Sequence, residues 1–239
     1  MAAQKPVYRR VVVKLSGEAL QGSSGHGVDI TAASYIAGEV KDLHRLGVQV
    51  SIVIGGGNII RGIQAQAGGM ERTTADYMGM LGTVINGLAL RDALEQASIE
   101  GWVMSALDVG AVVEPFTRRG AIHHLEKGRV LVFVGGTGNP YFSTDSAAAL
   151  RASEIGAEAV LKATKVDGVY SDDPVKNPDA VLYEKISYIE ALRKNLRVMD
   201  ATAFALCMEN SIPIRVFNMT VTGNFRKAVL GEKVGTLVS

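Results

Sequence analysis

The sequence predicts an α/β fold, a three-layer α/β/α sandwich in which helices cover both faces of a central, mostly parallel sheet. Three observations predict it: short apolar runs rich in valine and isoleucine, amphipathic segments between them, and glycine-rich turns where apolar runs end. Strands buried on both faces lack polar alternation, and alternating strands and helices imply crossover connections. At 239 residues, with no repeat or linker, the chain is expected to form a single domain, residues 1–239.

Each expected element follows from this pattern. The first helix presents Ile36, Val40 and Leu43 on one face and stops at Gly47. A second helix begins around Thr74 and repeats the spacing with Tyr77, Leu81, Val84, Leu88 and Leu94, and a third follows Thr144 and ends at Gly156. The apolar runs that we expect to form strands are residues 11–15, 48–54, 102–106, 130–134, 159–162 and 212–217.

Composition narrows the class of protein. The chain carries 25 Lys and Arg against 24 Asp and Glu, a net charge of +1, which argues against a protein that binds nucleic acid or anionic membrane. Cys207 is the single cysteine and has no partner for an internal disulfide, and no apolar run approaches the roughly 20 residues that span a bilayer. The first residues lack the apolar core of a signal peptide. We therefore expect a cytoplasmic protein.

Three consecutive glycines end the second expected strand. Gly55, Gly56 and Gly57 free the backbone for positive φ angles and expose successive N–H groups to an anion. Arg61 follows four residues after Gly57, from where its forked donors could reach the same oxygens. A tight strand-to-helix turn is the alternative, but the third glycine favours an anion site.

Two charged residues lie near this loop in the predicted fold. Lys14 ends the first strand beside Gly17, which suits a phosphate, although a lysine at a strand end is more often a solvated rim residue. Asp76 lies near the start of the second helix, where its carboxylate could cap free N–H groups or accept hydrogen bonds from the hydroxyls of a sugar.

A second glycine-rich loop follows the fourth expected strand. Residues 135–144 combine glycines, hydroxyl groups and two aromatic rings with the start of a helix, which resembles a second anion site beside a stacked base. Asp145 would repel phosphate unless it held nearby lysines in place, so we expect it to orient charge; an acidic helix cap is the alternative. The later loop, residues 162–174, carries Lys162 and Lys165 with three acids and Tyr170, which is also common in ordinary turns.

Other familiar sites are missing from the sequence. It contains no Gly-x-x-x-x-Gly-Lys-[Ser/Thr] or Gly-x-Gly-x-x-Gly motif and no cysteine–histidine spacing that suits zinc. His123 and His124 are adjacent in a polar stretch, and we expect both at the surface. Two glycine-rich anion loops with several cations, and no nucleophile–base set, indicate phosphoryl transfer, which depends on positioning and charge neutralisation.

The ordered motifs resemble those of bacterial UMP kinases, which belong to the amino acid kinase family. The resemblance runs from Val11 to Leu237 and rests on residues 11–18, 55–62, 75–81, 136–145, 162–170 and 213–219. It implies the amino acid kinase-like fold, with residues 1–150 forming roughly the phosphate-acceptor half and residues 151–239 the ATP-binding half. It implies reversible transfer of the γ-phosphoryl of ATP to UMP, giving UDP and ADP, with Mg²⁺ accompanying ATP, in pyrimidine nucleotide synthesis leading to UTP and CTP.

The resemblance also assigns residues to the two nucleotides. The residues implied for ATP are Lys14, Leu15, Ser16, Gly17, Gly57, Arg61, Thr164, Tyr170 and Asp173. The residues implied for UMP are Gly56, Asp76, Thr137, Gly138, Asn139, Pro140, Tyr141, Phe142, Ser143 and Thr144. The implied catalytic set is Lys14, Arg61, Asp145, Lys162 and Lys165, with Asp145 as organiser of the lysines and either Lys162 or Lys165 as the second cation. No direct protein ligand of Mg²⁺ is implied.

The resemblance further implies a cytoplasmic homohexamer, activation by GTP and inhibition by UTP. The loop that matches the GTP site in position is Gly22, Ser23, Ser24, Gly25, His26 and Gly27, whose residue types are those of a flexible linker.

Two other functions fit the same sequence. A carboxylate kinase of the same family would share the ATP half, but the aromatic pair in residues 137–144 and the segment around Asp76 favour a nucleotide acceptor. A non-catalytic nucleotide sensor would bind ATP without turnover. The joint presence of Lys14, Arg61, Asp76 and Asp145 argues against it.

Overall fold

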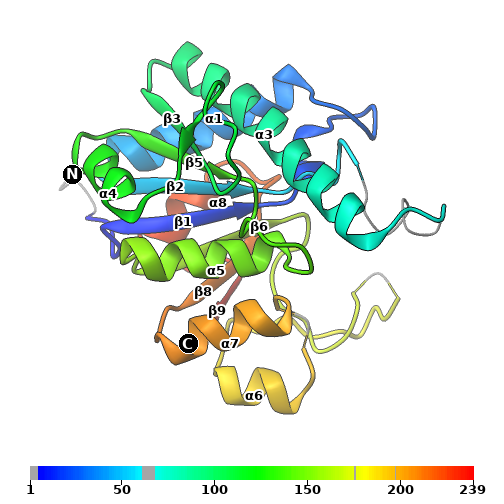
Figure 1. Cartoon of the computed structure of the whole chain (residues 1–239). Helices are drawn as coiled ribbons and strands as arrows, with labels where there is room; N and C mark the ends of the chain where they lie inside the picture. The colour runs from blue at the N-terminus through cyan, green and yellow to red at the C-terminus, as the bar shows by residue number, and fades with distance from the viewer. Residues whose placement is uncertain (1–4, 61–67, 175, 197) are drawn as a thin grey trace.

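The computed structural model (Figure 1) describes residues 5–60, 68–174, 176–196 and 198–239. Within them one sheet has the strand order β4-β3-β5-β2-β1-β6-β8-β9-β7. Neighbouring strands pair in parallel except β8 and β9, which are antiparallel. The strands are β1 (Arg10–Leu15), β2 (Gln49–Ile54), β3 (Gly101–Ser105), β4 (Glu114–Pro115), β5 (Val130–Val134), β6 (Ala159–Thr164), β7 (Lys185–Ile186), β8 (Ile214–Asn218) and β9 (Thr236–Val238).

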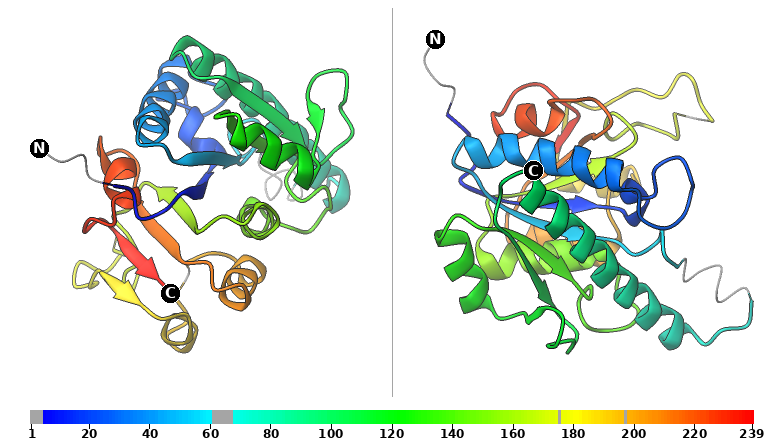
Figure 2. Two further views of the ribbon diagram at one scale, coloured as in Figure 1. Left: turned by 90° about the vertical axis from the view of Figure 1, so that its left-hand side faces the viewer. Right: turned by 90° about the horizontal axis from the view of Figure 1, so that it is seen from above.

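Helices cover both faces of the sheet, which confirms the predicted three-layer sandwich. One apolar core lies under α1 (Ile30–Arg45), α3 (Arg72–Gln96) and α8 (Asn224–Val229). The other lies under α4 (Arg118–Glu126), α5 (Thr144–Ile155), α6 (Tyr188–Arg193) and α7 (Ala201–Glu209). Viewed from above, α1 and α3 lie over the sheet (right view of Figure 2).

The central strand β1 sets the geometry of the site. It pairs with β2 on one side and β6 on the other, and Lys14 lies opposite Val53 and Lys162 in the two registers. Because these neighbours are parallel, their carboxyl ends meet at one edge, where ligands of open α/β sheets bind. The loops after β1, β2, β5 and β6 therefore converge there.

Local sequence sets the ends of the helices. Ser143 caps α5 by accepting from the N–H groups of Asp145 and Ser146, and Gly156 ends the helix with a φ of 65°, as predicted. The capping role considered for Asp76 is wrong, because α3 begins two residues before Thr74 and Glu71 caps it by accepting from the N–H groups of Thr73 and Thr74.

The predicted apolar face of α3 is only partly correct. Val84 and Leu94 are buried, but Tyr77 and Leu81 are 42% and 47% exposed, and Ile85 is 50% exposed. Small and polar residues, among them Gly82, Thr83, Asn86 and Gly87, take the inner face instead. They allow α3 to pack closely against the sheet: a Cβ at Gly87 would lie 2.4 Å from Val134 Cγ1.

Several short elements carry no sequence pattern and were not predicted. They include β4, β7 and β9, the 3₁₀ turn η1 (Gly17–Leu20), and helices α4, α6, α7 and α8. Elements of two to nine residues give too few periods for apolar spacing to identify them. Among the described residues, no helix combines the length and apolar character needed to cross a lipid bilayer.

Candidate functional site

Two lysines and an aspartate form a charged cluster at the carboxyl edge of the sheet. Lys14 on β1 pairs with Asp145 Oδ1 at 2.7 Å, and Lys162 on β6 pairs with Asp145 Oδ2 at 2.8 Å. The Lys162 ammonium also donates to the Val198 carbonyl at 2.7 Å. All three charged side chains are less than one-fifth exposed. Asp145 thus lies between the lysines rather than capping α5.

Burial and charge act against each other in this cluster. Burial by itself would raise the pKa of Asp145, but the ammonium groups of Lys14 and Lys162 outweigh it and hold that pKa below its usual value of 3.8. Burial lowers the pKa of Lys162 below 10.5, and Asp145 only partly offsets this effect. Two cations therefore share one carboxylate, which leaves net positive charge for an anion.

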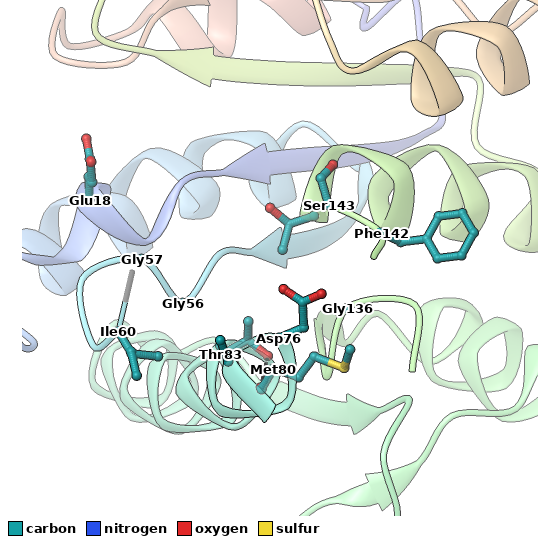
Figure 3. A pocket seen from close by; sticks show the side chains of 13 residues that line it. Glu18, Gly56, Gly57, Ile60, Asp76, Met80, Thr83, Gly136, Phe142 and Ser143 are labelled. Carbon is teal, nitrogen blue, oxygen red and sulfur yellow. Dashed lines mark hydrogen bonds between the residues drawn. The ribbon is translucent and has the colours of Figure 1, made fainter. Parts of the chain in front are cut away.

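A cavity of about 490 Å³ opens beside this cluster. Figure 3 shows Gly56 and Gly57 on one side, Asp76, Met80 and Thr83 on α3, and Ser143 at the start of α5. Thr144, which precedes Asp145 in the chain, also lines it, so the cavity lies next to the segment that carries Asp145. The other lining residues are Glu18, Ile60, Ala75, Gly79, Gly136 and Phe142.

Asp76 joins two walls of this cavity. Its Oδ2 accepts from the Tyr141 N–H at 2.8 Å and from Arg72 Nε at 2.9 Å. Tyr141 has a positive φ of 72°, and the Arg72 guanidinium lies 5.1 Å from the centre of its ring. The carboxylate thus fixes the loop after β5 to α3 and still lines the cavity.

Gly55, Gly56 and Gly57 differ from the prediction in their backbone angles. None of them has a positive φ, so that part of the prediction is wrong. Gly55 and Gly56 allow close packing: a Cβ on Gly56 would lie 2.2 Å from the Gly79 carbonyl oxygen, and one on Gly55 would lie 2.9 Å from Gly17 N. A Cβ on Gly57 would meet nothing within 4 Å. A substitution at Gly56 therefore disturbs the packing of α3 as well as the cavity, whereas one at Gly57 enters open space.

The loop after β5 does use positive φ angles. Gly135, Gly136 and Gly138 have φ values of 76°, 58° and 83°. Thr83 Oγ1 accepts from the Gly135 N–H at 2.7 Å and so ties this loop to α3. Of the residues predicted for UMP, Thr137, Gly138, Asn139, Pro140 and Tyr141 are not in the cavity lining, although the same loop supplies Phe142, Ser143 and Thr144.

A second cavity, of about 740 Å³, lies over β6 and β8. Lys162, Thr164, Tyr170 and Asp173 line it, together with Val198. Because Lys162 also pairs with Asp145, this cavity borders the charged cluster. The structure therefore brings together three residues that the resemblance assigns to ATP, Thr164, Tyr170 and Asp173.

The other predicted residues are either exposed, buried or outside the described part of the chain. Lys165 is exposed, whereas Lys162 lies in the cluster. Leu15 is fully buried in the core, so only its main chain is available to a nucleotide. Gly17 is closely packed, because a Cβ at this position would lie 2.4 Å from Asn58 Oδ1. Ser16 is exposed. Arg61 lies outside the described residues.

Asp200, which the sequence analysis missed, holds the two sides of the site together. Its carboxylate accepts from the hydroxyl groups of Ser143 and Ser146, and it caps α7 by accepting from the Ala203 N–H. It therefore links the start of α5 to the segment whose Val198 carbonyl binds Lys162. An aspartate before an apolar helix looks like an ordinary cap in the sequence, and only long-range contact reveals the second role.

Residues 22–27, predicted to bind GTP, are held by specific contacts. Ser24 Oγ lies 2.7 Å from the carbonyl oxygens of both Gln21 and His26, either of which can accept from its hydroxyl, and His26 Nδ1 lies 3.0 Å from the Ser24 carbonyl. Gly27 N–H donates to the Asn58 carbonyl at 2.8 Å, and Asn58 Nδ2 donates back to the Gly27 carbonyl. The loop is thereby attached to the glycine-rich loop after β2.

One predicted surface residue is buried. His124 is 6% exposed, stacks on Trp102 at 4.6 Å between ring centroids, and places Nε2 3.0 Å from Glu114 Oε2. The prediction for His124 is therefore wrong, because α4 turns this residue towards β3 and β4. This cluster is separate from the two cavities at the charged cluster.

The described residues contain no group of three or more His, Cys, Asp or Glu side chains suited to hold a metal ion. Mg²⁺ commonly retains water and is bound through one or two carboxylates together with substrate phosphates. A metal that enters with a nucleotide fits this donor set, in which Asp173 lines the second cavity and Asp145 is engaged by lysines.

The similarity of this chain to known proteins identifies its family. The pattern of the amino acid kinase family matches residues 9–218. The chain belongs to the amino acid kinase family. Among family members of known structure, the UMP kinase of Bacillus anthracis is 42% identical with a TM-score of 0.94, and the match covers 97% of this chain and 96% of that one.

Two further structures extend the comparison within the family. The UMP kinase of Ureaplasma parvum is 41% identical, with a TM-score of 0.92 and coverage of 97% of this chain and 98% of that one. The uridylate kinase of Archaeoglobus fulgidus is 30% identical, with a TM-score of 0.73 and coverage of 96% and 99%.

Proposed function

We propose that this member of the amino acid kinase family is a UMP kinase, which transfers the γ-phosphoryl group of ATP to UMP and forms UDP and ADP. The observation that carries the proposal is the Lys14–Asp145–Lys162 cluster, which adjoins both cavities. Similarity to UMP kinases over 97% of the chain supports UMP as the acceptor. UMP would occupy the cavity beside Asp76, and ATP the cavity beside Tyr170.

The reaction then needs little from the protein beyond position and charge. An oxygen of the UMP phosphate attacks the γ-phosphorus of ATP, the bond to the β,γ-bridging oxygen breaks, and ADP leaves with that electron pair. The UMP phosphate is already an anion, so no general base is required. Lys14 and Lys162 offset the charge of the approaching phosphates, and Asp145 holds both ammonium groups in place. Mg²⁺, bound with ATP, would supply further neutralisation on the phosphate oxygens.

Regulation and cellular role are also part of the proposal. We propose a cytoplasmic enzyme of pyrimidine nucleotide synthesis, with its acceptor half in roughly residues 1–150 and its ATP half in residues 151–239. GTP activation through residues 22–27 is supported by the contact of Gly27 with Asn58, next to Gly57. UTP inhibition rests on the family resemblance alone.

Self-association into a homohexamer has separate support on α3. Tyr77, Met78, Leu81 and Ile85 are each more than one-third exposed on this helix. A contiguous apolar strip of this kind on a protein surface marks an interaction site. A second copy of the chain is the partner that the family resemblance implies.

Release of ADP, measured with a panel of acceptors, tests the function. We expect turnover with UMP in the presence of ATP and Mg²⁺, and much slower turnover with CMP, AMP, acetylglutamate, aspartate and glutamate. Product analysis should identify UDP. A preference for any of the amino acids would instead favour a carboxylate kinase.

A further inference from the structure

A separate cavity of about 330 Å³ lies at the β7–β9–β8 edge of the sheet. Arg215 on β8, Lys185 on β7 and residues 231–235 line it. Arg215 precedes Val216 on β8, and successive side chains of a strand point to opposite faces. Val216 lines the proposed ATP cavity, so the two cavities lie on opposite faces of this strand.

Arg215 is buried without a matching negative charge. It is only 8% exposed, and its Nη1 donates to the Val234 carbonyl at 3.3 Å. Its Nε is buried and has no hydrogen-bond partner within the described part of the chain. It forms no ion pair with any described acid, and the residues outside that description include no aspartate or glutamate.

The other buried arginine shows what a satisfied guanidinium looks like in this protein. Arg151 is 5% exposed, pairs with Glu154 and lies 3.8 Å from the centre of the Phe116 ring. Arg215 has neither an acid nor a ring of this kind among the described contacts. Burying an unpaired charge is costly, so a buried guanidinium normally has an anionic partner.

The rest of the lining leaves room for that partner. Lys185 and Lys233 add two cations, while Glu184 is paired with Lys233 at 3.1 Å, and Glu232 is the other acid. Gly231 and Gly235 adopt positive φ values of 73° and 58°, which only a residue without a side chain takes easily. The cavity is at the small end of the range for small-molecule sites.

We propose that this cavity binds a phosphate group, either free or carried by a small metabolite, with Arg215 as its principal ligand. The planar guanidinium presents paired N–H donors that match two phosphate oxygens. The phosphate supplies the negative charge that Arg215 lacks, and Lys185 adds to the attraction from the rim. The site is distinct from the two substrate cavities.

Calorimetric titration of the full-length chain tests the proposal. The protein is first saturated with UMP and a non-hydrolysable ATP analogue, so that both substrate cavities are filled, and is then titrated with inorganic phosphate or with ribose 5-phosphate. We expect saturable binding of at least one probe, and the tighter of the two shows whether the site prefers free or esterified phosphate. Arg215→Gln should weaken binding by about tenfold or more, the contribution of a charge-assisted hydrogen bond.

Variants that remove a positive or a negative charge from the lining test whether charge controls phosphate binding. Lys185→Gln should weaken binding and Glu232→Gln should strengthen it, because both residues line the cavity. Lys227→Gln removes an exposed cation from nearby α8, outside the lining, and should leave binding unchanged. If Arg215→Gln does not fold, the Lys185 and Glu232 variants decide.

Three results would overturn the proposal. They are the absence of saturable binding of both probes to the substrate-saturated wild type, unchanged binding in folded Arg215→Gln, and equal effects of Lys185→Gln and Lys227→Gln.

Discussion

At the scale of single residues, the structure separates the two candidates for the second cation of the proposed reaction. Lys162 ends the expected strand at residues 159–162 and Lys165 lies three residues later, and the sequence does not separate them. In the fold, Lys162 pairs with Asp145 at 2.8 Å, whereas Lys165 is exposed. We therefore expect Lys162→Met to lower kcat by about a hundredfold or more, as loss of a charge-stabilising donor does. Lys165→Met, the matched control, should retain most of the activity, and equal losses would contradict the assignment.

The lowered pKa of Lys162 predicts how activity depends on pH. Burial lowers the pKa of Lys162 below 10.5, so its positive charge is lost at a lower pH than that of an ordinary lysine. Activity should therefore fall on the alkaline side as pH rises through that pKa. Lys162→Arg, whose guanidinium stays protonated, should shift the fall in kcat to higher pH. Asp145 adds no acid limb near neutrality, because its lysine partners hold its pKa below 3.8.

The pH–kcat profiles of wild type, Lys162→Arg and Lys165→Arg check this expectation. The Lys165 variant should follow the wild type. An active Lys162→Arg enzyme with an unchanged alkaline limb would show that another group titrates there.

At the scale of elements, Asp200 joins α5 to α7. Asp200→Ala removes the acceptor for Ser143 and Ser146 and the cap of α7. Loss of the cap should lower the free energy of unfolding by about 1 kcal/mol. Because Ser143 lines the proposed UMP cavity, the KM for UMP should also rise by about tenfold, the effect of losing a hydrogen bond to a charged group.

Ser187→Ala provides a control for the element prediction. Ser187 caps α6 by accepting from the Glu190 N–H and lines neither substrate cavity. Urea unfolding should show a comparable loss of stability, while the KM for UMP stays at the wild-type value. A rise in KM in both variants would mean that general destabilisation, and not the Asp200 contact, controls UMP binding.

Sequence reasoning succeeded for long elements and failed for contacts made at a distance. Apolar runs located the buried strands, and Thr144 and Gly156 marked the two ends of α5. The face of α3 was assigned wrongly in part, because Tyr77 and Leu81 have core-like spacing but point to solvent. The position of Lys14 opposite Lys162 depends on strand register, and the contacts of Asp200 depend on how distant segments fold together. The spacing of residues in the sequence does not reveal either.

At the scale of the whole molecule, the exposed strip on α3 predicts how copies of the chain associate. Leu81 and Ile85 lie one turn apart and are 47% and 50% exposed. Leu81→Glu with Ile85→Glu should break the assembly into smaller species, because burial of a carboxylate in an apolar contact is unfavourable. Light scattering after size-exclusion chromatography measures the mass.

Ile189→Glu serves as the control for association. Ile189 is 59% exposed on α6, away from α3. It should leave the mass unchanged. A monomeric wild type, or an intact assembly in the double variant, would contradict the role of α3.

The central claim is that the cluster around Asp145 transfers phosphate to UMP rather than merely binding nucleotides. The most direct measurement compares UMP-dependent ADP release with UMP and ATP binding in wild type and Lys14→Ala. The Lys14 ammonium pairs with Asp145 at 2.7 Å, so its loss should lower kcat by about a hundredfold or more while binding changes far less. Equal losses of turnover and binding, or a wild type that binds UMP without UMP-dependent turnover, would contradict the account and favour a nucleotide sensor.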